Sequence, residues 1–197
     1  MTSPERFDAA YYRRFYGRRP VHDRRRIGLL ATAVVAWAGW WRIPIRSVLD
    51  VGAGKGYWKQ WFAANHPRVR YHGLDVSAHA CRAHGHELAD IASWSPPRQY
   101  DLVVCQSVLQ YMDDEACARA INVLDRACGS LMYLEVPTAA DRDEIIDAAR
   151  TDMDVHWRSG DWYRERLAAD FAEVGAGMWV SRQTPVPFFE LEISRRF

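Results

Sequence analysis

A short apolar run that breaks into three closely spaced glycines constrains the fold of this chain more than any other stretch. Residues 48–51 read Val-Leu-Asp-Val, and Gly52, Gly54 and Gly56 follow before the bulky Tyr57. Without β-carbons at these positions, the backbone can bend sharply and let a ligand lie directly against it, close to a helix N-terminus. The pattern predicts a strand, a tight ligand-binding loop and the start of a helix.

Length and composition indicate one domain. The chain has 197 residues, 49% of them hydrophobic, and a formal net charge of +1. It can therefore form one well-buried core, and no overall field would draw it to nucleic acid or to a membrane. The four cysteines contain no C-x-x-C pair, and the histidines near them do not have the spacing of a structural zinc site. We expect a cytoplasmic protein without a metal.

The apolar segment 27–41 is nearly free of charge and follows three arginines. Its fifteen residues are fewer than the roughly 20 that span a bilayer. Trp37, Trp40 and Trp41 occupy positions where a secretion signal needs small residues. The segment is predicted to be a buried helix that packs on a sheet, and no membrane contact is expected.

Short apolar runs alternate with helical patterns from residue 45 to residue 137, which predicts right-handed crossovers and a parallel sheet. Residues 177–182 and 188–194 flank a turn with two prolines and predict an antiparallel hairpin. We expect an α/β fold of about seven strands, mostly parallel, with helices on both faces. The single domain has three predicted parts: N-terminal helices or lid in 1–44, a cofactor-binding core in 45–137, and a substrate-side segment with the hairpin in 138–197.

Polar residues follow the carboxyl ends of several predicted strands, where ligands bind in open parallel sheets. Asp75, Asp90 and Gln106 hold such positions. Asp75 comes 19 residues after Gly56, close to the spacing of about 20 expected for an acid that binds a ribose. Tyr57 replaces the third glycine of a dinucleotide fingerprint, and no P-loop pattern occurs. The predicted ligand is a nucleoside-containing cofactor other than a dinucleotide.

The stretch from Asp50 to Gly56, with the strand-end residues that follow it, resembles class I S-adenosylmethionine-dependent methyltransferases over about residues 45–137. The resemblance implies a Rossmann-like sheet, S-adenosylmethionine as cofactor and S-adenosylhomocysteine as product. It also implies residue roles: Gly52, Ala53 and Gly54 line the methionine moiety, Asp50 helps to hold its amino group, Asp75 binds both ribose hydroxyls, Val76 lies against the adenine ring, Asp90 accepts from the adenine amino group, Ile91 donates from its backbone, and Gln106 borders the methionine part and the substrate.

The N-terminal segment 4–19 carries aromatic residues spaced along one side of a helix, together with several arginines. Two interpretations of this segment do not exclude each other. In one it is an amphipathic helix docked on the core, and in the other it is a lid that brings aromatic faces and positive charge over a ligand. As a lid, it would place Tyr12 on the cofactor and Tyr16 on the substrate.

A catalytic base is expected from the C-terminal half of the chain. His156 is the first candidate, because it lies in a polar loop and a histidine pKa of about 6.5 suits a base. A surface or structural histidine fits the same pattern. Glu135 and Tyr111 are further candidates, and Tyr111 and Trp157 are expected to contact the substrate.

The acceptor class follows only in outline. Residues 106–109 read Gln-Ser-Val-Leu, which differs from the Asn/Asp-Pro-Pro-Tyr/Phe motif of enzymes that methylate amino groups of nucleic acids. We expect metal-independent O- or N-methylation of a small molecule. A methyltransferase that acts on RNA or protein through the basic N-terminal segment remains an alternative, as does a non-catalytic partner protein with this fold.

Overall fold

The computed structural model describes residues 4–18 and 20–193. Its strands are β1 Ser47–Val51, β2 Arg70–Asp75, β3 Glu87–Leu88, β4 Tyr100–Gln106, β5 Cys128–Glu135, β6 Phe171–Glu173 and β7 Met178–Ser181. Its α-helices are α1 Ala9–Tyr16, α2 Arg24–Trp40, α3 Tyr57–Asn65, α4 Ala78–His84, α5 Asp114–Ala127, α6 Ala139–Glu144 and α7 Gly160–Leu167. Short 3-10 helices lie at Pro4–Arg6, Leu109–Tyr111 and Glu190–Glu192.

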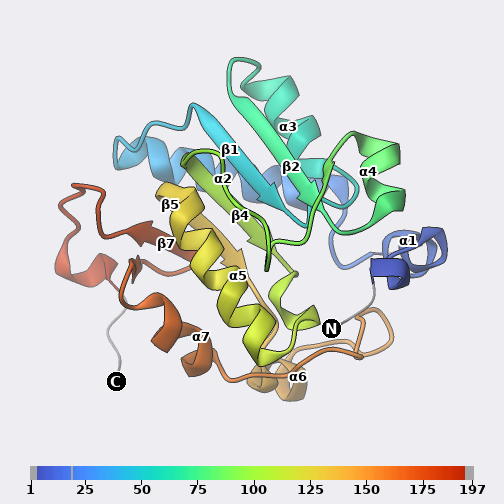
Figure 1. The fold of residues 1–197 in the computed structure, drawn as a ribbon. Coiled ribbons are helices and arrows are strands. Elements are labelled where there is room, and N and C mark those ends of the chain that lie inside the picture. The colour runs from blue at the N-terminus through green and yellow to red at the C-terminus, as the bar shows by residue number, and fades with distance from the viewer. Residues whose placement is uncertain (1–3, 19, 194–197) are drawn as a thin grey trace.

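Within the described residues, seven strands form one sheet in the order β3-β2-β1-β4-β5-β7-β6. Strands β1 to β5 run parallel, whereas β7 is antiparallel to both of its neighbours. Helices lie on both faces of this sheet (Figure 1). The predicted α/β, Rossmann-like sheet with antiparallel strands at its C-terminal edge is therefore confirmed.

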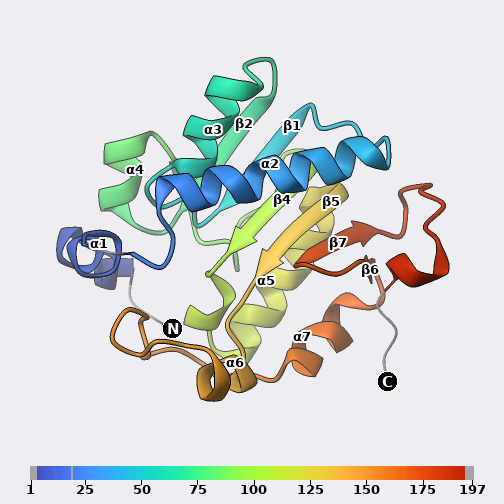
Figure 2. The same ribbon diagram turned by 180° about the vertical axis from the view of Figure 1, so that it is seen from behind.

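Helix α2 covers one face of the sheet. It begins after Asp23, whose side chain accepts a hydrogen bond from the backbone N–H of Arg26. Its inward residues are buried and recur every three or four positions, which is the spacing of one helix face. These residues are Ile27, Ala31, Val34 and Ala38. Figure 2 shows α2 lying across β1, β4 and β5, as the sequence predicted for segment 27–41. Among the described residues, no helix is long and apolar enough to cross a membrane.

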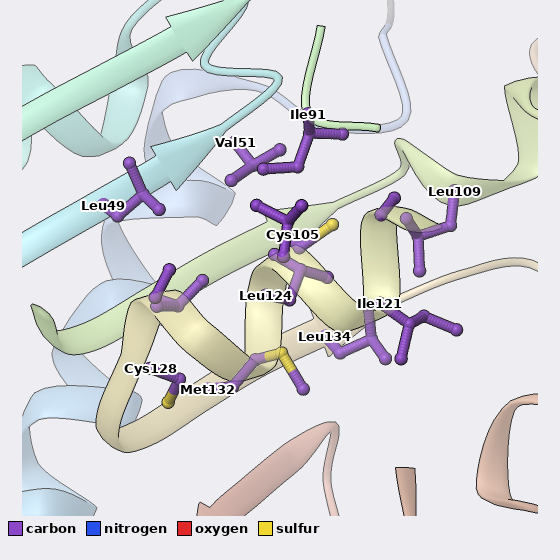
Figure 3. Packing of buried hydrophobic residues seen from close by; sticks show 14 of the residues in the cluster. Leu49, Val51, Ile91, Cys105, Leu109, Ile121, Leu124, Cys128, Met132 and Leu134 are labelled. Atoms are coloured by element: carbon purple, nitrogen blue, oxygen red, sulfur yellow. The ribbon is translucent and has the colours of Figure 1, made fainter. Parts of the chain in front are cut away.

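Helix α5 covers the opposite face, together with α7. Ile121 and Leu124 of α5 pack over Cys105 of β4 and over Met132 and Leu134 of β5 (Figure 3). Strands β1 and β4 are almost entirely buried because helices lie on both of their faces. This burial explains why both strands are nearly continuous apolar runs in the sequence.

The predicted C-terminal hairpin is wrong in detail. The antiparallel pair consists of β6 and β7, and residues 188–193 form no strand; residue 194 lies outside the described residues. Phe188 instead stacks on Trp37 at 5.9 Å and meets Trp41 edge-on at 4.8 Å between ring centroids. The apolar side chain that suggested a strand therefore packs, half-buried, against the end of α2.

Candidate active site

The loop between β1 and α3 has a backbone conformation that favours glycine at three positions. Gly52, Gly54 and Gly56 have φ values of 68°, 49° and 65°, in the left-handed region. A Cβ on Gly52 would lie 2.3 Å from Cγ2 of Val108, a contact too short for real atoms. The backbone at Gly52 therefore stays bare on the side that faces Val108 and the main cavity.

Asp75 and His86 fix the position of this loop by hydrogen bonds to the backbone of Gly54. Oδ2 of Asp75 accepts from the backbone N–H of Gly54 at 2.8 Å, and its Oδ1 accepts from that of Ser77 at 2.7 Å. Burial raises the pKa of Asp75, against the opposing effect of these backbone hydrogen bonds. Nε2 of His86 lies 3.1 Å from the carbonyl oxygen of Gly54, and burial lowers the pKa of this histidine. A neutral His86 thus donates to the loop.

A cavity opens above the glycine loop at the carboxyl ends of β1, β2 and β4. It brings together eight of the predicted cofactor-binding residues: Tyr12, Gly52, Gly54, Asp75, Val76, Asp90, Ile91 and Gln106. Its remaining walls are mostly apolar and aromatic, with Phe7, Tyr11, Val108 and Met112 among them. We call this space the cofactor cavity.

The two other residues of the predicted set lie beside this space. Asp50 and Ala53 line a small neighbouring cavity that also contains Gly52, Gly54 and Gln106. The Asp50 carboxyl is buried and accepts a hydrogen bond from the Tyr71 hydroxyl. Burial raises the pKa of Asp50 to about 7, although the Tyr71 hydrogen bond acts in the opposite direction. Asp50 of β1 therefore binds a side chain of the neighbouring strand β2, whatever it contributes to ligand binding.

The N-terminal segment covers the cofactor cavity. Ser77 Oγ donates to the carbonyl oxygen of Phe7, and Lys55 Nζ donates to that of Tyr16 at 3.3 Å. Nη2 of Arg6 lies 2.7 Å from Oδ2 of Asp152, which ties the segment to the loop after α6. The views in Figures 1 and 2 agree that α1 lies beside the ligand-binding edge of the sheet. The helix is thus docked on the core, and its Tyr11, Tyr12 and Tyr16 line the cavity. Its action as a lid over a ligand stays a prediction, and residue 19 lies outside the described residues.

A second cavity adjoins the first and has a volume of about 450 Å³. Tyr11, Tyr16, Ser107 and Tyr111 line both cavities. The predicted substrate residues Tyr16 and Tyr111 therefore lie where the two spaces meet. Burial raises the pKa values of Tyr11 and Tyr111, so both hydroxyls stay protonated at neutral pH and Tyr111 cannot serve as a base there. We call this second space the acceptor cavity.

Glu135, at the end of β5, is the polar centre of the acceptor cavity wall. Its Oε1 lies 2.9 Å from Nε2 of His22 and accepts from Ser107 Oγ at 3.2 Å. Its Oε2 accepts from Tyr133 Oη at 2.9 Å and from Gln106 Nε2 at 3.1 Å. Burial opposes ionisation, but the hydrogen bonds from His22, Tyr133 and Gln106 outweigh it and keep the pKa of Glu135 below its usual value. The carboxyl group is ionised.

Ser107 holds an unusual backbone conformation at the same place. Its φ is 57°, a left-handed value that is rare for a residue with a side chain. Its backbone N–H donates to the carbonyl oxygen of Glu135 at 2.8 Å, and its hydroxyl donates to the Glu135 carboxylate. Such strain persists where the surrounding structure enforces it, which is common at functional sites.

His156, the first candidate base, does not line the cofactor cavity, the acceptor cavity or the small cavity beside Asp50. It is exposed, and its backbone N–H donates to the carbonyl oxygen of Gln110. Trp157 lines none of these cavities either, and its ring packs against Arg142 at 5.7 Å. His22, by contrast, lines the acceptor cavity and contacts Glu135. No local sequence pattern could have singled out His22, since its partner comes from a distant strand.

Within residues 4–18 and 20–193, no three histidine, cysteine, aspartate or glutamate side chains are grouped as a metal site would need. Several polar groups around the two cavities, among them Asp75 and Glu135, are instead paired with other side chains or with the backbone.

The comparisons with known proteins agree with this architecture. Residues 49–131 match the family model described as a methyltransferase domain. The trans-aconitate 2-methyltransferase of Methylobacterium radiotolerans is 30% identical over 133 residues, 61% of this chain and 48% of the relative. That of Rhodopseudomonas palustris is 26% identical over 129 residues, 59% of this chain and 50% of the relative. The match spans about half the length of these curated relatives.

Solved structures share the fold at low sequence identity. Magnesium protoporphyrin IX methyltransferase from Synechocystis PCC 6803, with S-adenosylmethionine bound, has a TM-score of 0.63 at 19% identity and covers 90% of this chain and 94% of its own. An amino pentose methyltransferase from Micromonospora echinaspora, also bound to S-adenosylmethionine, has a TM-score of 0.62 at 15% identity. The match covers 89% of this chain and 97% of that protein. The match to the methyltransferase domain model and the shared fold together support a methyltransferase domain of class I, the S-adenosylmethionine-dependent type.

Proposed function

We propose that this chain is an S-adenosylmethionine-dependent methyltransferase that acts on a small-molecule acceptor, by O- or N-methylation and without a metal. The observation that carries the proposal is the junction of two cavities at Tyr11, Tyr16, Ser107 and Tyr111. One cavity has the glycine loop and the strand-end acids, and the other has the volume of a small-molecule site. A methyl group would pass between them.

The residues of the cofactor cavity fit S-adenosylmethionine. The bare backbone at Gly52 admits close approach, and the buried Asp75 carboxylate stands at the end of β2. The proposed contacts follow the resemblance: Asp50, Gly52, Ala53 and Gly54 for the methionine end, Asp75 for the ribose hydroxyls, Val76 for the adenine ring, Asp90 and the Ile91 backbone for the adenine edge, Gln106 for the border with the acceptor, and Tyr12 for the covering face.

When bound, S-adenosylmethionine supplies a methyl group on a positively charged sulfur that leaves readily. The protein must then align the acceptor and take up its proton. We propose that His22 takes the proton, because its imidazole contacts the ionised Glu135 in the wall of the acceptor cavity. Glu135 would stabilise the positive charge that develops on His22.

The acceptors in the names of related proteins differ widely, since they include trans-aconitate, a porphyrin and an amino pentose. A small molecule is proposed here because residues of α1 line both cavities and the loop after α6 lines the acceptor cavity, which gives each cavity walls on several sides. The three-part division of the domain is retained in this proposal, with residues 1–44 as cover, 45–137 as cofactor-binding core and 138–197 as acceptor side. A cytoplasmic location is proposed as well, because Cys81, Cys105, Cys117 and Cys128 are all free and buried.

Two experiments test the proposal. Calorimetric titration with S-adenosylhomocysteine should show binding, and no binding at about millimolar concentration would overturn the cofactor assignment. Cell extract supplied with a radiolabelled methyl donor should then yield label in the small-molecule fraction. Label in RNA or protein would favour the macromolecular alternative, and no label in any fraction would favour a non-catalytic protein.

A further inference from the structure

The acceptor cavity is lined by more acidic than basic side chains. Among the described residues, its carboxylates are Glu135, Asp141, Asp147 and Asp152, whereas Arg150 is its guanidinium and His22 its imidazole. Asp152 is paired with a cation, Arg6. Asp141 accepts from the backbone N–H and the hydroxyl of Thr138, and these neutral donors leave its charge in place. The cavity therefore keeps a negative charge that disfavours an acidic acceptor.

The most important of these charges stands next to the cofactor cavity. Glu135 contacts Ser107, which lines both cavities, and its carboxylate is ionised for the reasons given above. Its side chain is 33% exposed, so it remains open to the cavity in spite of its four donors. An ionised carboxylate in a partly buried wall attracts a nearby cation more strongly than one in bulk water does.

A buried hydrogen-bond acceptor in the same wall lacks a donor. Gln110 is only 3% exposed and lines the acceptor cavity, and its Oε1 has no hydrogen-bond partner among the described residues. A buried carbonyl oxygen without a donor is destabilising by about 1–3 kcal/mol. An N–H group of a bound molecule would satisfy it, whereas a carboxylate would repel it.

Several other residues of the lining are apolar. Phe15 comes from α1, Val21 precedes α2, Val136 and Pro137 follow β5, and Ile145 and Ile146 follow α6. These side chains offer a surface to a hydrocarbon or aromatic body of moderate size. A highly charged acceptor would lose its hydration against them without gaining partners.

We propose that the acceptor is a compact amine, a basic nitrogen on an apolar body, whose nitrogen is recognised by Glu135 and the Gln110 amide oxygen. The inference rests on the proposed function and narrows it to N-methylation. The ammonium form first gives one proton to His22. The nitrogen lone pair then forms the new N–C bond as the bond from the methyl carbon to sulfur breaks, with its electron pair going to sulfur. The second proton leaves the product for solvent.

The test compares two probes of similar size and opposite charge, 2-phenylethylamine and 3-phenylpropionate. Each is titrated by calorimetry into the full chain at pH 7, with and without saturating S-adenosylhomocysteine. We expect the amine to bind at least about tenfold more tightly than the acid, because the wall charge attracts one and repels the other. Equal binding, tighter binding of the acid, or no binding of the amine at about 10 mM would overturn the inference.

Two variants show whether the preference comes from the assigned residue. Glu135→Gln keeps the shape of the side chain and should remove most of the preference for the amine. Glu115→Gln, an exposed change on α5, should keep it. A preference that survives in Glu135→Gln would overturn the assignment to Glu135. The affinity for S-adenosylhomocysteine is measured in parallel. If the unmodified chain does not bind S-adenosylhomocysteine, the proposed function is refuted. The comparison of the two probes in the absence of S-adenosylhomocysteine still decides the charge preference of the cavity.

Discussion

The hydroxyl groups of Tyr11 and Tyr111 lie 2.7 Å apart and form a hydrogen bond between α1 and the 3-10 helix after β4. Both residues line the cofactor cavity and the acceptor cavity. The ring of Phe7 meets each of them edge-on, with centroids 5.1 and 5.0 Å apart. The N-terminal segment is thus attached at the place where the two cavities join.

Removal of the Tyr11 hydroxyl should loosen this cover. A hydrogen bond of this kind contributes about 1 kcal/mol, so we expect Tyr11→Phe to release S-adenosylhomocysteine roughly fivefold faster, as measured by stopped-flow fluorescence. Tyr111→Phe should have a similar effect. The double variant should be little worse than either single one, because both remove the same bond. Strictly additive effects would show that the hydroxyls act independently.

The glycine loop should tolerate no side chain at Gly52. Gly52→Ala would force a left-handed alanine and a clash with Val108, and we expect at least about tenfold weaker binding of S-adenosylhomocysteine by calorimetry. Gly175→Ala is a matched control, because Gly175 has a φ of 83° and open space around its missing Cβ. It should lower stability but leave affinity unchanged. The additional change Val108→Ala should restore part of the affinity lost in Gly52→Ala, and no recovery would exclude the clash as its cause.

Once a methyl acceptor is identified, variants of His22 and His156 should differ in kcat. His22→Ala removes the proposed proton acceptor, and we expect kcat to fall by about 10²-fold or more while S-adenosylhomocysteine affinity is kept. His156→Ala should leave both quantities unchanged, since His156 is exposed and outside the cavities. The opposite result would restore His156 as the base.

Asp50 should make stability depend on pH in an unusual direction. Its folded-state pKa is raised to about 7, above the value of about 3.9 in an unfolded chain. Between these values the folded protein holds a proton that the unfolded chain has lost, so this contribution to stability is complete below about pH 4 and is lost as the pH rises toward 7. The slope reaches at most about 1.4 kcal/mol per pH unit.

The measurement compares the free energy of unfolding of the unmodified chain and of Asp50→Asn by denaturant titration from pH 4 to pH 8. Asparagine does not titrate, so the difference between the two proteins should change in favour of Asp50→Asn as the pH rises. Parallel curves over this range would show that the Asp50 carboxyl titrates normally in the fold.

The sequence by itself determined the features that depend on local pattern. The glycine loop, the strands from β1 to β5 and the buried helix α2 follow from residue periodicity and backbone freedom, which neighbouring residues specify. Asp75, Asp90 and Gln106 could be placed at one edge of the sheet, because parallel strands present their carboxyl ends together. The hairpin was misplaced because the apolar pattern around Phe188 indicates packing against the core. The pattern does not distinguish a strand in the sheet from a loop that packs on a helix.

Only the tertiary structure decided the acceptor side. His22 and Glu135 come from opposite parts of the chain, and their contact depends on how the segment before α2 passes the end of β5. The acidic wall of the acceptor cavity and the exposure of His156 depend in the same way on how loops pack against each other. Such loop contacts carry no periodic signal, so the sequence indicated the cofactor, while only the folded chain shows the second cavity and its acidic wall.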